Sequence, residues 1–426
     1  MNYKEALEFI HGRERFGEYK GLDRMRELMQ SLGNPQDKLK FVHVAGTNGK
    51  GSTVKLIASA LCEAGYKTGM YISPFVEVFN ERMQINGENI SDSDLVALTE
   101  KVKKAIEALD DKGTYPPVTE FEAVTAIAFC YYAQENCDVV VLEVGLGGRY
   151  DATNIIKQPL VSVITAISLD HTAVLGNTHA IIAGEKCGII KENCPAVLYP
   201  YQDKDATEVV ENKCGEMNAS LVVPNISLIK NLKITSGGAS FTYKDVDLSL
   251  SLAGVHQVYN AVTAYETLSI LRQNGMKIED EHIKAGFSEC KFFGRLYKLT
   301  DNIIFDGAHN PDGIDALCDY IDSFVDGNLI VVMGMVKDKE YSYCIKKIAS
   351  LADEYIAVEV PSPRKLPWQE NLEEAKKYCG NSKGYTDIEK AIKDVMDKLS
   401  DNDTLIICGS LYLLGEAKIV VERYLL

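Results

Sequence analysis

The chain has 426 residues, which predicts two to three domains at roughly 150 residues each. Hydrophobic residues make up 46% and charged residues 25% of the chain, a balance that excludes wholesale disorder. The formal net charge of −16 argues against a broad nucleic-acid-binding face, because such a face needs an excess of basic residues.

Two further features bear on location and ligands. No apolar run approaches the roughly 20 residues needed to cross a bilayer, and residues 1–20 lack the apolar core of a secretory signal. The 11 cysteines form no Cys-x-x-Cys pair, which argues against zinc-ribbon and thioredoxin-type motifs. We therefore expect a cytoplasmic protein with reduced thiols that binds neither membranes nor nucleic acid. An anionic ligand would then be held by a few basic side chains grouped at one site, by helix N-termini or by metal ions.

The first predicted elements alternate between strands and helices. Residues 1–38 have a helical pattern and are followed by an apolar strand over 41–45. A glycine-rich loop over 46–53 leads into a helix over 54–64 and then a strand over 68–72. This order is typical of a mostly parallel sheet covered by helices.

The alternation continues through the middle of the chain. A helix is predicted over 119–133, and continuous apolar strands of the kind buried on both faces are predicted over 138–144 and 160–167. Residues 220–252 alternate polar and apolar side chains instead. We expect these residues to form an antiparallel patch at the edge of the sheet.

A second α/β block begins near residue 297, where the strand–helix alternation restarts. No linker rich in Gly, Ser or Pro marks the join. The predicted strands of this block cover 302–305, 329–333, 354–358 and 404–408.

The strongest functional signal is the loop over 46–53, GTNGKGST, between a buried strand and a helix. Such a turn directs backbone N–H groups toward one point at the positive end of a helix dipole, and Lys50 adds a mobile charge for phosphate oxygens. The Walker pattern is not strictly met, because its first glycine would be Val44 and Gly51 stands where Ser or Thr is expected. We expect a phosphate-binding loop rather than a glycine-rich turn without a ligand.

Polar residues follow three of the predicted strands. Glu143 lies near the end of a buried strand, where a carboxylate is costly unless it meets a cation. Strand ends in a parallel sheet face the phosphate loop, so nucleotide-bound Mg²⁺ is the expected partner, with an ion pair to Arg149 or a lysine as the alternative. Ser73 and His171 follow the neighbouring strands, but a lone histidine is more often structural than a ligand. Considered on its own, Lys186 is a solvated helix lysine.

Nine sequence blocks occur in order over nearly the whole chain, and together they resemble the folylpolyglutamate synthase/dihydrofolate synthase family of the Mur ligase superfamily. The blocks are GTNGKGST (46–53), ISPFVEVFNERMQING (72–87), EVGLGGRYDATN (143–154), LDHTAVLG (169–176), EKCGIIK (185–191), HQVYNA (256–261), FDGAHNPDG (305–313), VMGMVKDKE (332–340) and CGSLYLLGE (408–416).

The resemblance implies an α/β fold with two domains. Residues 1–294 would form a P-loop ATPase domain with a mostly parallel sheet, of the Mur ligase central type. Residues 295–426 would form a smaller Rossmann-like α/β glutamate-ligase domain.

The implied activity is ATP-dependent joining of L-glutamate to folates, and also to dihydropteroate, through an acyl-phosphate intermediate. The implied partners are these small molecules and ATP, with Mg²⁺ as the metal and the protein as a monomer. Lys50 corresponds to the lysine on the terminal phosphates, and Asp306 would suit the ribose hydroxyls. The residues implied for ATP binding are Thr47, Asn48, Gly49, Lys50, Gly51, Ser52, Thr53, Asn260, Arg295, Asp306 and His309.

Lys186 matches a lysine that is carbamylated in this family, a change that turns a cation into a carboxylate-like metal ligand. The resemblance therefore reverses the solvated-lysine interpretation. The implied metal ligands are Ser52, Ser73, Glu143, His171 and carbamylated Lys186, and the implied catalytic residues are Lys50, Glu143, His171 and Lys186.

The residues implied for folate binding include one departure from the family pattern. The family often has Ser-Pro-His where this chain has Ser73-Pro74-Phe75. A phenylalanine stacks on a pterin but offers no ring nitrogen for a hydrogen bond, so the choice between folates and dihydropteroate stays open. The implied folate-binding set is Phe75, Asn80, Arg82, Thr119 and Phe121.

Two alternatives remain at this point. The first is another Mur-type ligase, although only about 40 residues precede Gly46, fewer than the roughly 100 of a typical nucleotide-sugar domain. The second is a nucleotide-dependent switch or binding module without ligase chemistry. Against the switch, the segment Asn212-Lys213-Cys214-Gly215 lacks the aspartate of a guanine-reading motif.

Overall fold

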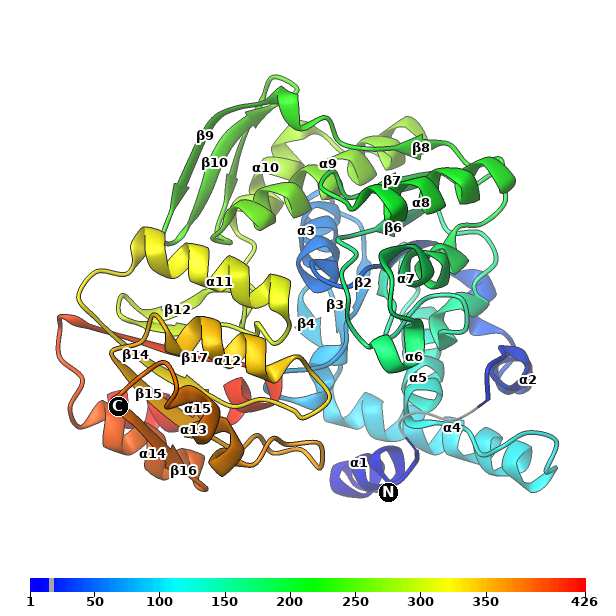
Figure 1. The fold of residues 1–426 in the computed structure, drawn as a ribbon. Coiled ribbons are helices and arrows are strands. Elements are labelled where there is room, and N and C mark those ends of the chain that lie inside the picture. Colours follow the sequence, from blue (N-terminus) through cyan, green and yellow to red (C-terminus); the bar gives the residue numbers. More distant parts are fainter. Residues whose placement is uncertain (15–18) are drawn as a thin grey trace.

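The computed structural model describes residues 1–14 and 19–426, which fold into two α/β parts that lie side by side (Figure 1). In the described chain, an eight-stranded and a three-stranded sheet precede Gly294, and a six-stranded sheet follows it. The predicted α/β fold class, with a mostly parallel first sheet, is confirmed.

The first sheet has the order β4-β3-β2-β5-β1-β6-β7-β8. Its strands from β2 to β8 in this order are parallel, whereas β3 and β4 pair antiparallel at one edge. The central strands β1 and β5 are buried throughout, as their continuous apolar sequences predict. The bounds are β1 (Phe41–Ala45), β2 (Thr68–Tyr71), β3 (Met83–Ile85), β4 (Glu88–Asn89), β5 (Val139–Glu143), β6 (Val161–Ile164), β7 (Ala196–Leu198) and β8 (Leu221–Val222).

Helices bury both faces of this sheet. One face packs on α1, α2, α4 and α5, with α7 and α8 beside β6 and β7, and the other packs on α3, α9 and α10. The bounds are α1 (Tyr3–His11), α2 (Asp23–Ser31), α3 (Lys50–Glu63), α4 (Asp92–Asp111), α5 (Glu120–Gln134), α6 (Thr172–Leu175), α7 (His179–Lys186), α8 (Lys204–Glu216), α9 (Val255–Gln273) and α10 (Asp280–Ser288), with 3-10 turns η1 (Pro35–Lys38), η2 (Phe79–Arg82), η3 (Ala152–Ile155), η4 (Cys187–Ile189) and η5 (Ile226–Leu228).

Two helix predictions need adjustment. Residues 1–38 hold α1, α2 and the turn η1 rather than continuous helix, and the prediction for residues 15–18 lies outside the described residues. Helix α3 begins at Lys50 and not at residue 54, because Gly49, with φ of 83°, lets the phosphate loop turn directly into the helix. None of the helices in the described residues is long and apolar enough to span a membrane.

The antiparallel patch forms a sheet of its own, which corrects its predicted place at the sheet edge. Strands β9 (Ile229–Thr235), β10 (Gly238–Tyr243) and β11 (Val246–Leu250) pair in the order β11-β10-β9, while β8 occupies the edge of the first sheet. The inward side chains of β11 alternate with exposed ones, and Leu248 and Leu250 join the core with α9 and α10. The apolar face of this sheet is buried against helices, and that burial stabilises it where it lies.

The C-terminal sheet has the order β12-β13-β17-β14-β15-β16. All of its pairings are parallel except that between β12 and β13. The edge strands β12 and β16 were not predicted, because they are short and half-buried and have no continuous apolar run. The bounds are β12 (Tyr297–Thr300), β13 (Ile303–Phe305), β14 (Asn328–Met333), β15 (Glu354–Val358), β16 (Ser382–Tyr385), β17 (Asp403–Cys408), α11 (Pro311–Phe324), α12 (Tyr341–Ala349), α13 (Trp368–Ala375), α14 (Ile388–Met396) and α15 (Leu411–Leu425).

The close packing of α10 on α3 predicts a strong effect of one added methyl group. A Cβ at Gly286 would lie 2.5 Å from the backbone nitrogen of Ala60, so Gly286→Ala should lower the free energy of unfolding by about 1–3 kcal/mol. Gly215 in α8 has no atom within 4 Å of such a Cβ, so Gly215→Ala should be neutral or stabilising by up to ~1 kcal/mol. Urea denaturation checks the pair, and equal stabilities would contradict the close helix approach.

Candidate active site between the two domains

The phosphate loop links the central strand β1 to α3. Lys50 folds back over this loop, with its Nζ donating to the carbonyl oxygens of Gly46 at 3.2 Å and Thr47 at 3.1 Å. Gly49 has no room for a side chain, since a Cβ there would lie 2.4 Å from Oδ1 of Asn260 on α9. The loop is therefore held between β1 and α9 with its backbone N–H groups at the start of a helix, the geometry that binds phosphate.

Two hydroxyl groups at the start of α3 are buried without a hydrogen-bond partner among the described residues. They belong to Ser52 and Thr53. An unpaired buried hydroxyl is costly, and Ser52 lines the cavity at the phosphate loop, so its Oγ has the right place for a phosphate-bound metal ion. Thr53 does not line this cavity.

Glu143 ends β5 and points toward the same loop. Its side chain is buried, and Oε2 accepts a hydrogen bond from the backbone N–H of Ser73 at 3.2 Å. Burial raises the pKa of this carboxyl group, while Lys50 opposes the shift. The alternative, an ion pair of Glu143 with Arg149 or a lysine, does not form among the described residues. The Nε of Arg149 instead lies 3.5 Å from Glu185.

Lys186 lies beneath the phosphate loop and not in solvent, so the interpretation drawn from its local sequence alone is wrong. Its side chain is 3% exposed, and its Nζ donates to the carbonyl oxygen of Gly46 at 2.8 Å. Burial, together with the nearby charge of Lys50, lowers the pKa of Lys186 to about 7. The lowered pKa favours the neutral amine, which is the form that reacts with CO₂.

His171 and Asp170 follow β6 and contact Lys339 of the C-terminal domain. The Nζ of Lys339 lies 2.5 Å from Oδ1 of Asp170 and 3.3 Å from Nε2 of His171. Burial lowers the pKa of His171 to about 4, and Lys339 adds to this effect. Burial alone would raise the pKa of Asp170, but Lys339 and His171 outweigh it and hold the pKa below its usual range.

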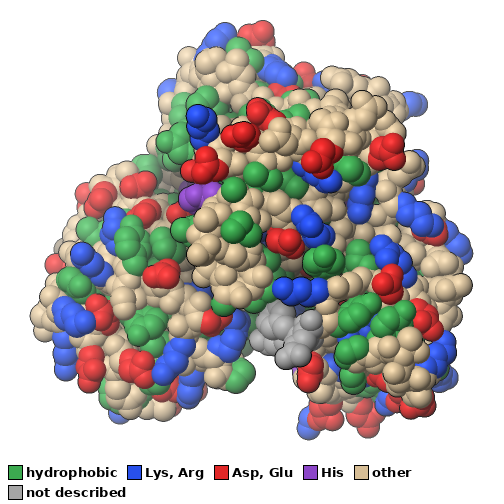
Figure 2. Space-filling model, turned by 45° about the vertical axis from the view of Figure 1, so that its right-hand side comes forward, with side chains coloured by type: hydrophobic (Ala, Val, Ile, Leu, Met, Phe, Trp, Pro, Cys, Tyr) green, Lys and Arg blue, Asp and Glu red, His purple; other side chains and the backbone are tan. Residues whose placement is uncertain are grey.

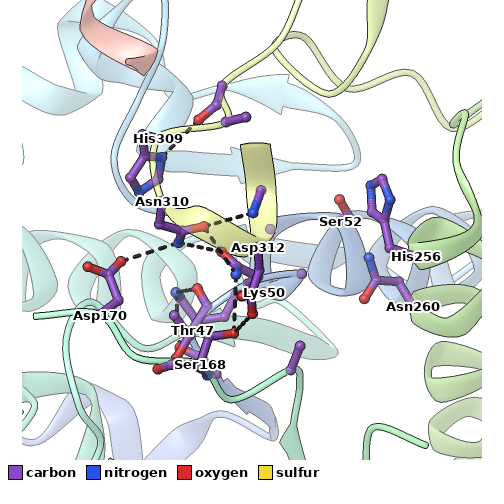
Figure 3. A pocket seen from close by; sticks show the side chains of 18 of the residues that line it. Thr47, Lys50, Ser52, Ser168, Asp170, His256, Asn260, His309, Asn310 and Asp312 are labelled. Atoms are coloured by element: carbon purple, nitrogen blue, oxygen red, sulfur yellow. Dashed lines mark hydrogen bonds between the residues drawn. The ribbon is translucent and has the colours of Figure 1, made fainter. Parts of the chain in front are cut away.

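The start of α11 in the C-terminal domain lies directly over the phosphate loop (Figure 3). Asn310 caps α11 and donates from its side chain to Oδ1 of Asn48 at 2.9 Å, while Asp312 accepts from the hydroxyl of Ser168. Asn310, Asp312 and Lys339 were not singled out from the sequence. The signal that could have found them is their position in two of the matching blocks, FDGAHNPDG and VMGMVKDKE.

A cavity of about 360 Å³ lies between the phosphate loop and the C-terminal domain. Asn260, Arg295, Asp306 and His309 line it, as do the phosphate-loop residues from Thr47 to Ser52. The Asp306 carboxylate is buried and accepts from the backbone N–H groups of Leu296 and Ala308, each at 2.8 Å. The residues implied for ATP binding therefore come together in one cavity, with the exception of Thr53.

A second cavity of about 740 Å³ adjoins the first and shares Ser73, His171 and His309 with it. Of the five residues implied for folate binding, Arg82, Thr119 and Phe121 line this cavity. Phe75 and Asn80 do not. Both are occupied elsewhere: the Phe75 ring packs against Phe79 with centroids 5.8 Å apart, and the Asn80 amide donates to the Ile90 carbonyl at 2.7 Å and to Asp92 at 2.9 Å.

The residues implied as metal ligands lie around the first cavity, and two of them, Ser73 and His171, also line the second. Ser52, Ser73, Glu143, His171 and Lys186 all line the first cavity. In the described chain, no group of three or more His, Cys, Asp and Glu side chains is placed to hold a metal ion. The implied set is not of this kind, because it consists of two serines, a lysine, one glutamate and one histidine.

Comparison with known proteins identifies both parts of the chain. The Mur ligase middle domain matches residues 44–268, and the Mur ligase, glutamate ligase domain matches residues 294–411. The chain is 38% identical to the dihydrofolate synthase/folylpolyglutamate synthase of Bacillus subtilis (strain 168), over 98% of both lengths. It is 35% identical to the folylpolyglutamate synthase of Lacticaseibacillus casei, over 97% of both lengths.

Two solved structures have the same fold over almost the whole chain. The Mycobacterium tuberculosis folylpolyglutamate synthase complexed with ADP and AMPPCP aligns with a TM-score of 0.89 and 29% identity, covering 98% of each chain. The E. coli protein FolC in complex with DHPP and ADP aligns with a TM-score of 0.85 and 29% identity, covering 100% of this chain and 99% of that one.

The ion pair between Lys339 and Asp170 predicts a test of domain docking. The two side chains are only 6% and 9% exposed, so Lys339→Met leaves a buried carboxylate unpaired and should lower the free energy of unfolding by roughly 3–5 kcal/mol. Chemical denaturation measures this loss, and small-angle X-ray scattering should show a larger radius of gyration.

Lys337→Met is the matched control, because Lys337 pairs with Glu370 at the exposed surface and such pairs contribute at most about 1 kcal/mol. Equal effects of the two substitutions would contradict the role given to Lys339.

Proposed function

The chain belongs to the folylpolyglutamate synthase/dihydrofolate synthase family of ATP-dependent ligases, and we propose that it joins L-glutamate to folates and to dihydropteroate. Family, fold and ATP-dependent ligase activity agree with the resemblance found in the sequence. The observation that supports the substrate assignment is the junction of the two cavities. The phosphate-loop cavity opens at Ser73 and His171 into a larger cavity that has room for a second, bulkier substrate.

The proposed reaction has two steps. A carboxylate is a poor acyl donor, so one of its oxygens first attacks the γ-phosphorus of ATP. The bond between this phosphorus and the oxygen that bridges it to the β-phosphate breaks, and ADP leaves. The amine of glutamate, in its deprotonated form, then attacks the acyl carbon, expels inorganic phosphate and loses one proton as the amide forms. The products are an amide, ADP and phosphate. No observation favours the switch without ligase chemistry.

The residues of the first cavity account for phosphate binding and transfer. The backbone N–H groups at the start of α3 and the Lys50 ammonium group hold the terminal phosphates. The buried, unpaired Ser52 hydroxyl and the buried Glu143 carboxylate fit a hard cation, and Ser73, His171 and carbamylated Lys186 would complete its ligands. Mg²⁺ bound there would neutralise charge on the transferring phosphoryl group. Helix α11 lies over the loop through contacts such as that of Asn310 with Asn48, and this cover would limit the access of water to an acyl phosphate formed there.

We further propose that the protein acts as a monomer in the cytoplasm without a nucleic-acid partner. The charge of the chain argues against a nucleic-acid partner, because 61 acidic residues outnumber 45 basic ones. On the face drawn in Figure 2, basic and acidic side chains are interspersed without a broad basic area. Sedimentation velocity, measured at the protein concentration used for the activity assays, tests whether the protein is a monomer.

Lys50→Ala and Glu143→Gln should each reduce turnover about 100- to 1000-fold, which corresponds to about 2.7–4 kcal/mol of transition-state stabilisation. The physical reason is that both side chains act on charge that develops during phosphoryl transfer. Steady-state phosphate release at saturating ATP and Mg²⁺ measures the loss, with circular dichroism as the control for folding. Either variant retaining half of the wild-type turnover would contradict its assignment.

Lys186→Ala should nearly abolish activity, and acetate or formate should restore part of it. The reason is that a carbamate on Lys186 presents carboxylate oxygens, which a small acid can supply in the space left by the side chain. Turnover is measured with increasing acetate and, as the control, with increasing methylamine. Rescue by the amine and not by the acid would mean that Lys186 works as a cation.

An acceptor panel tests the proposed function. Purified protein with ATP, Mg²⁺ and L-glutamate should release phosphate and form a glutamylated product with reduced folates and with dihydropteroate. A UDP-N-acetylmuramoyl acceptor should give neither. Phosphate release with the UDP-linked acceptor and not with pterin acceptors would overturn the assignment.

A further inference from the structure

The loop after β2 carries Ser73 into the site, and helix α15 of the C-terminal domain packs directly on this loop. Ser73 lines both cavities, and residues 74–78 connect it to the turn η2. The Val76 side chain packs against the core cluster formed by β13, β17 and α15. A segment of the N-terminal domain that begins at a proposed metal ligand is therefore seated on the C-terminal domain.

The contact between α15 and the loop depends on the absence of a side chain at Gly415. A Cβ on this residue would lie 2.2 Å from the carbonyl oxygen of Val76 and 3.5 Å from the Cα of Glu77. Glycine is among the least favourable residues in the interior of a helix, so its presence within α15 needs a packing reason. The close approach of the two backbones supplies that reason.

An ion pair holds the same loop one helical turn further along α15. Lys418 pairs with Glu77 of the loop, and its Nζ also lies 3.5 Å from Oε1 of Glu422 within the helix. Residues one turn apart share a helix face, so Gly415 and Lys418 contact the loop from the same side. The pair with Glu77 joins the two domains, whereas the pair with Glu422 stays within one of them.

The loop is also fixed by hydrogen bonds within the N-terminal domain. The Glu81 carboxylate accepts the backbone N–H groups of residues 76–78, at 2.8 to 2.9 Å. At the other end of the loop, the backbone N–H of Ser73 donates to Glu143 at 3.2 Å. Only residues 74 and 75 separate these two anchors, so a displacement of the loop at α15 is carried to Ser73.

We propose that Gly415 is a positioning residue for Ser73, because it lets α15 seat the loop that carries Ser73 to the metal site. This inference rests on the proposed function, in which Ser73 is one of the Mg²⁺ ligands. Gly415 itself lies outside the described walls of both cavities, so it acts on the metal through the loop. Docking of the C-terminal domain would thereby be coupled to the binding of the metal.

Gly415→Ala tests the proposal in the full-length protein, because the added methyl group displaces the loop. The affinity for the ATP analogue AMPPCP is measured by isothermal titration calorimetry with Mg²⁺ and with EDTA, and Mg²⁺ should tighten binding by the wild type. The substitution should weaken the binding of Mg²⁺ to the AMPPCP complex about 10-fold, the loss expected when the support of a metal ligand is removed. The affinity for AMPPCP without metal should be unchanged, since Ser73 acts on the metal and not on the nucleotide.

The double variant with Ser73→Ala separates a positioning role from a general structural one. Ser73→Ala alone should weaken Mg²⁺ binding by at least the same factor. Adding Gly415→Ala should cause no further loss, because no Ser73 hydroxyl is left to position. Losses that add in the double variant would overturn the inference, since Gly415 would then act on another part of the site.

Glu77→Gln and Glu422→Gln form a matched pair that decides the question even where Gly415→Ala does not fold. Lys418 pairs with both carboxylates, but only Glu77 belongs to the loop. Glu77→Gln should weaken Mg²⁺ binding about threefold, in keeping with the modest strength of a partly exposed ion pair. Glu422→Gln should leave it unchanged.

Three results would overturn the inference. They are wild-type Mg²⁺ binding in a folded Gly415→Ala protein, equal Mg²⁺ binding in the two glutamine variants, and AMPPCP binding by the wild type that does not respond to Mg²⁺. A wild-type protein that binds AMPPCP with Mg²⁺ but shows no pterin-dependent glutamylation would overturn the proposed substrate assignment and leave the inference about Gly415 intact.

Discussion

Two lysine side chains converge on one carbonyl oxygen beneath the phosphate loop, and the site is arranged around that constraint. Lys50 and Lys186 both donate to the oxygen of Gly46, at 3.2 and 2.8 Å. Two ammonium groups this close repel each other, and burial removes the water that would screen them. The protein offsets the cost with the buried carboxylate of Glu143 and by lowering the pKa of Lys186 to about 7. Such a centre gains stability when negative charge is added, as phosphate or as carbamate.

The two domains meet at the strand ends that carry the site. Strand ends of the first sheet place Ser73, Glu143 and His171 beside the phosphate loop, and the C-terminal sheet faces them with its own strand ends. Asn310 and Lys339 bridge the gap through Asn48 and Asp170. Both contacts are polar and at least partly buried, so removing one partner leaves the other without its hydrogen bond or counter-charge. In the proposed reaction, the substrates would meet where these two sets of strand ends enclose one volume.

Much of this fold follows from sequence patterns. Continuous apolar runs predicted the buried strands β1, β5 and β14, because a strand covered on both faces excludes polar side chains. The short edge strands β12 and β16 escaped prediction, since a half-buried strand needs no such run. The separate sheet β9–β11 was misplaced because alternation shows that one face is buried but not which element buries it.

Some residues of the candidate site could be predicted from the sequence and others could not, because only some of them depend on neighbours in the chain. The phosphate loop is one continuous segment, so the spacing of its glycines and Lys50 was enough to indicate it. Lys186 could not be placed by spacing, because its burial depends on packing under a loop 140 residues away in the chain. The pairing of Asn48 with Asn310 and of Asp170 with Lys339 is likewise a property of domain docking. A sequence pattern shows whether a segment is buried or exposed. It does not show which distant segment packs against it, and these contacts depend on that packing.

We propose that the phosphate loop and its neighbours activate the acceptor carboxylate by phosphorylation, a step that oxygen-18 transfer detects. A folate acceptor labelled with oxygen-18 in its reacting carboxylate is turned over with unlabelled ATP, and the released phosphate is analysed by mass spectrometry. We expect one labelled oxygen in each phosphate released, because the carboxylate oxygen that attacked phosphorus leaves with it. Unlabelled phosphate, formed at the same rate as the amide, would mean that the carboxylate is not phosphorylated.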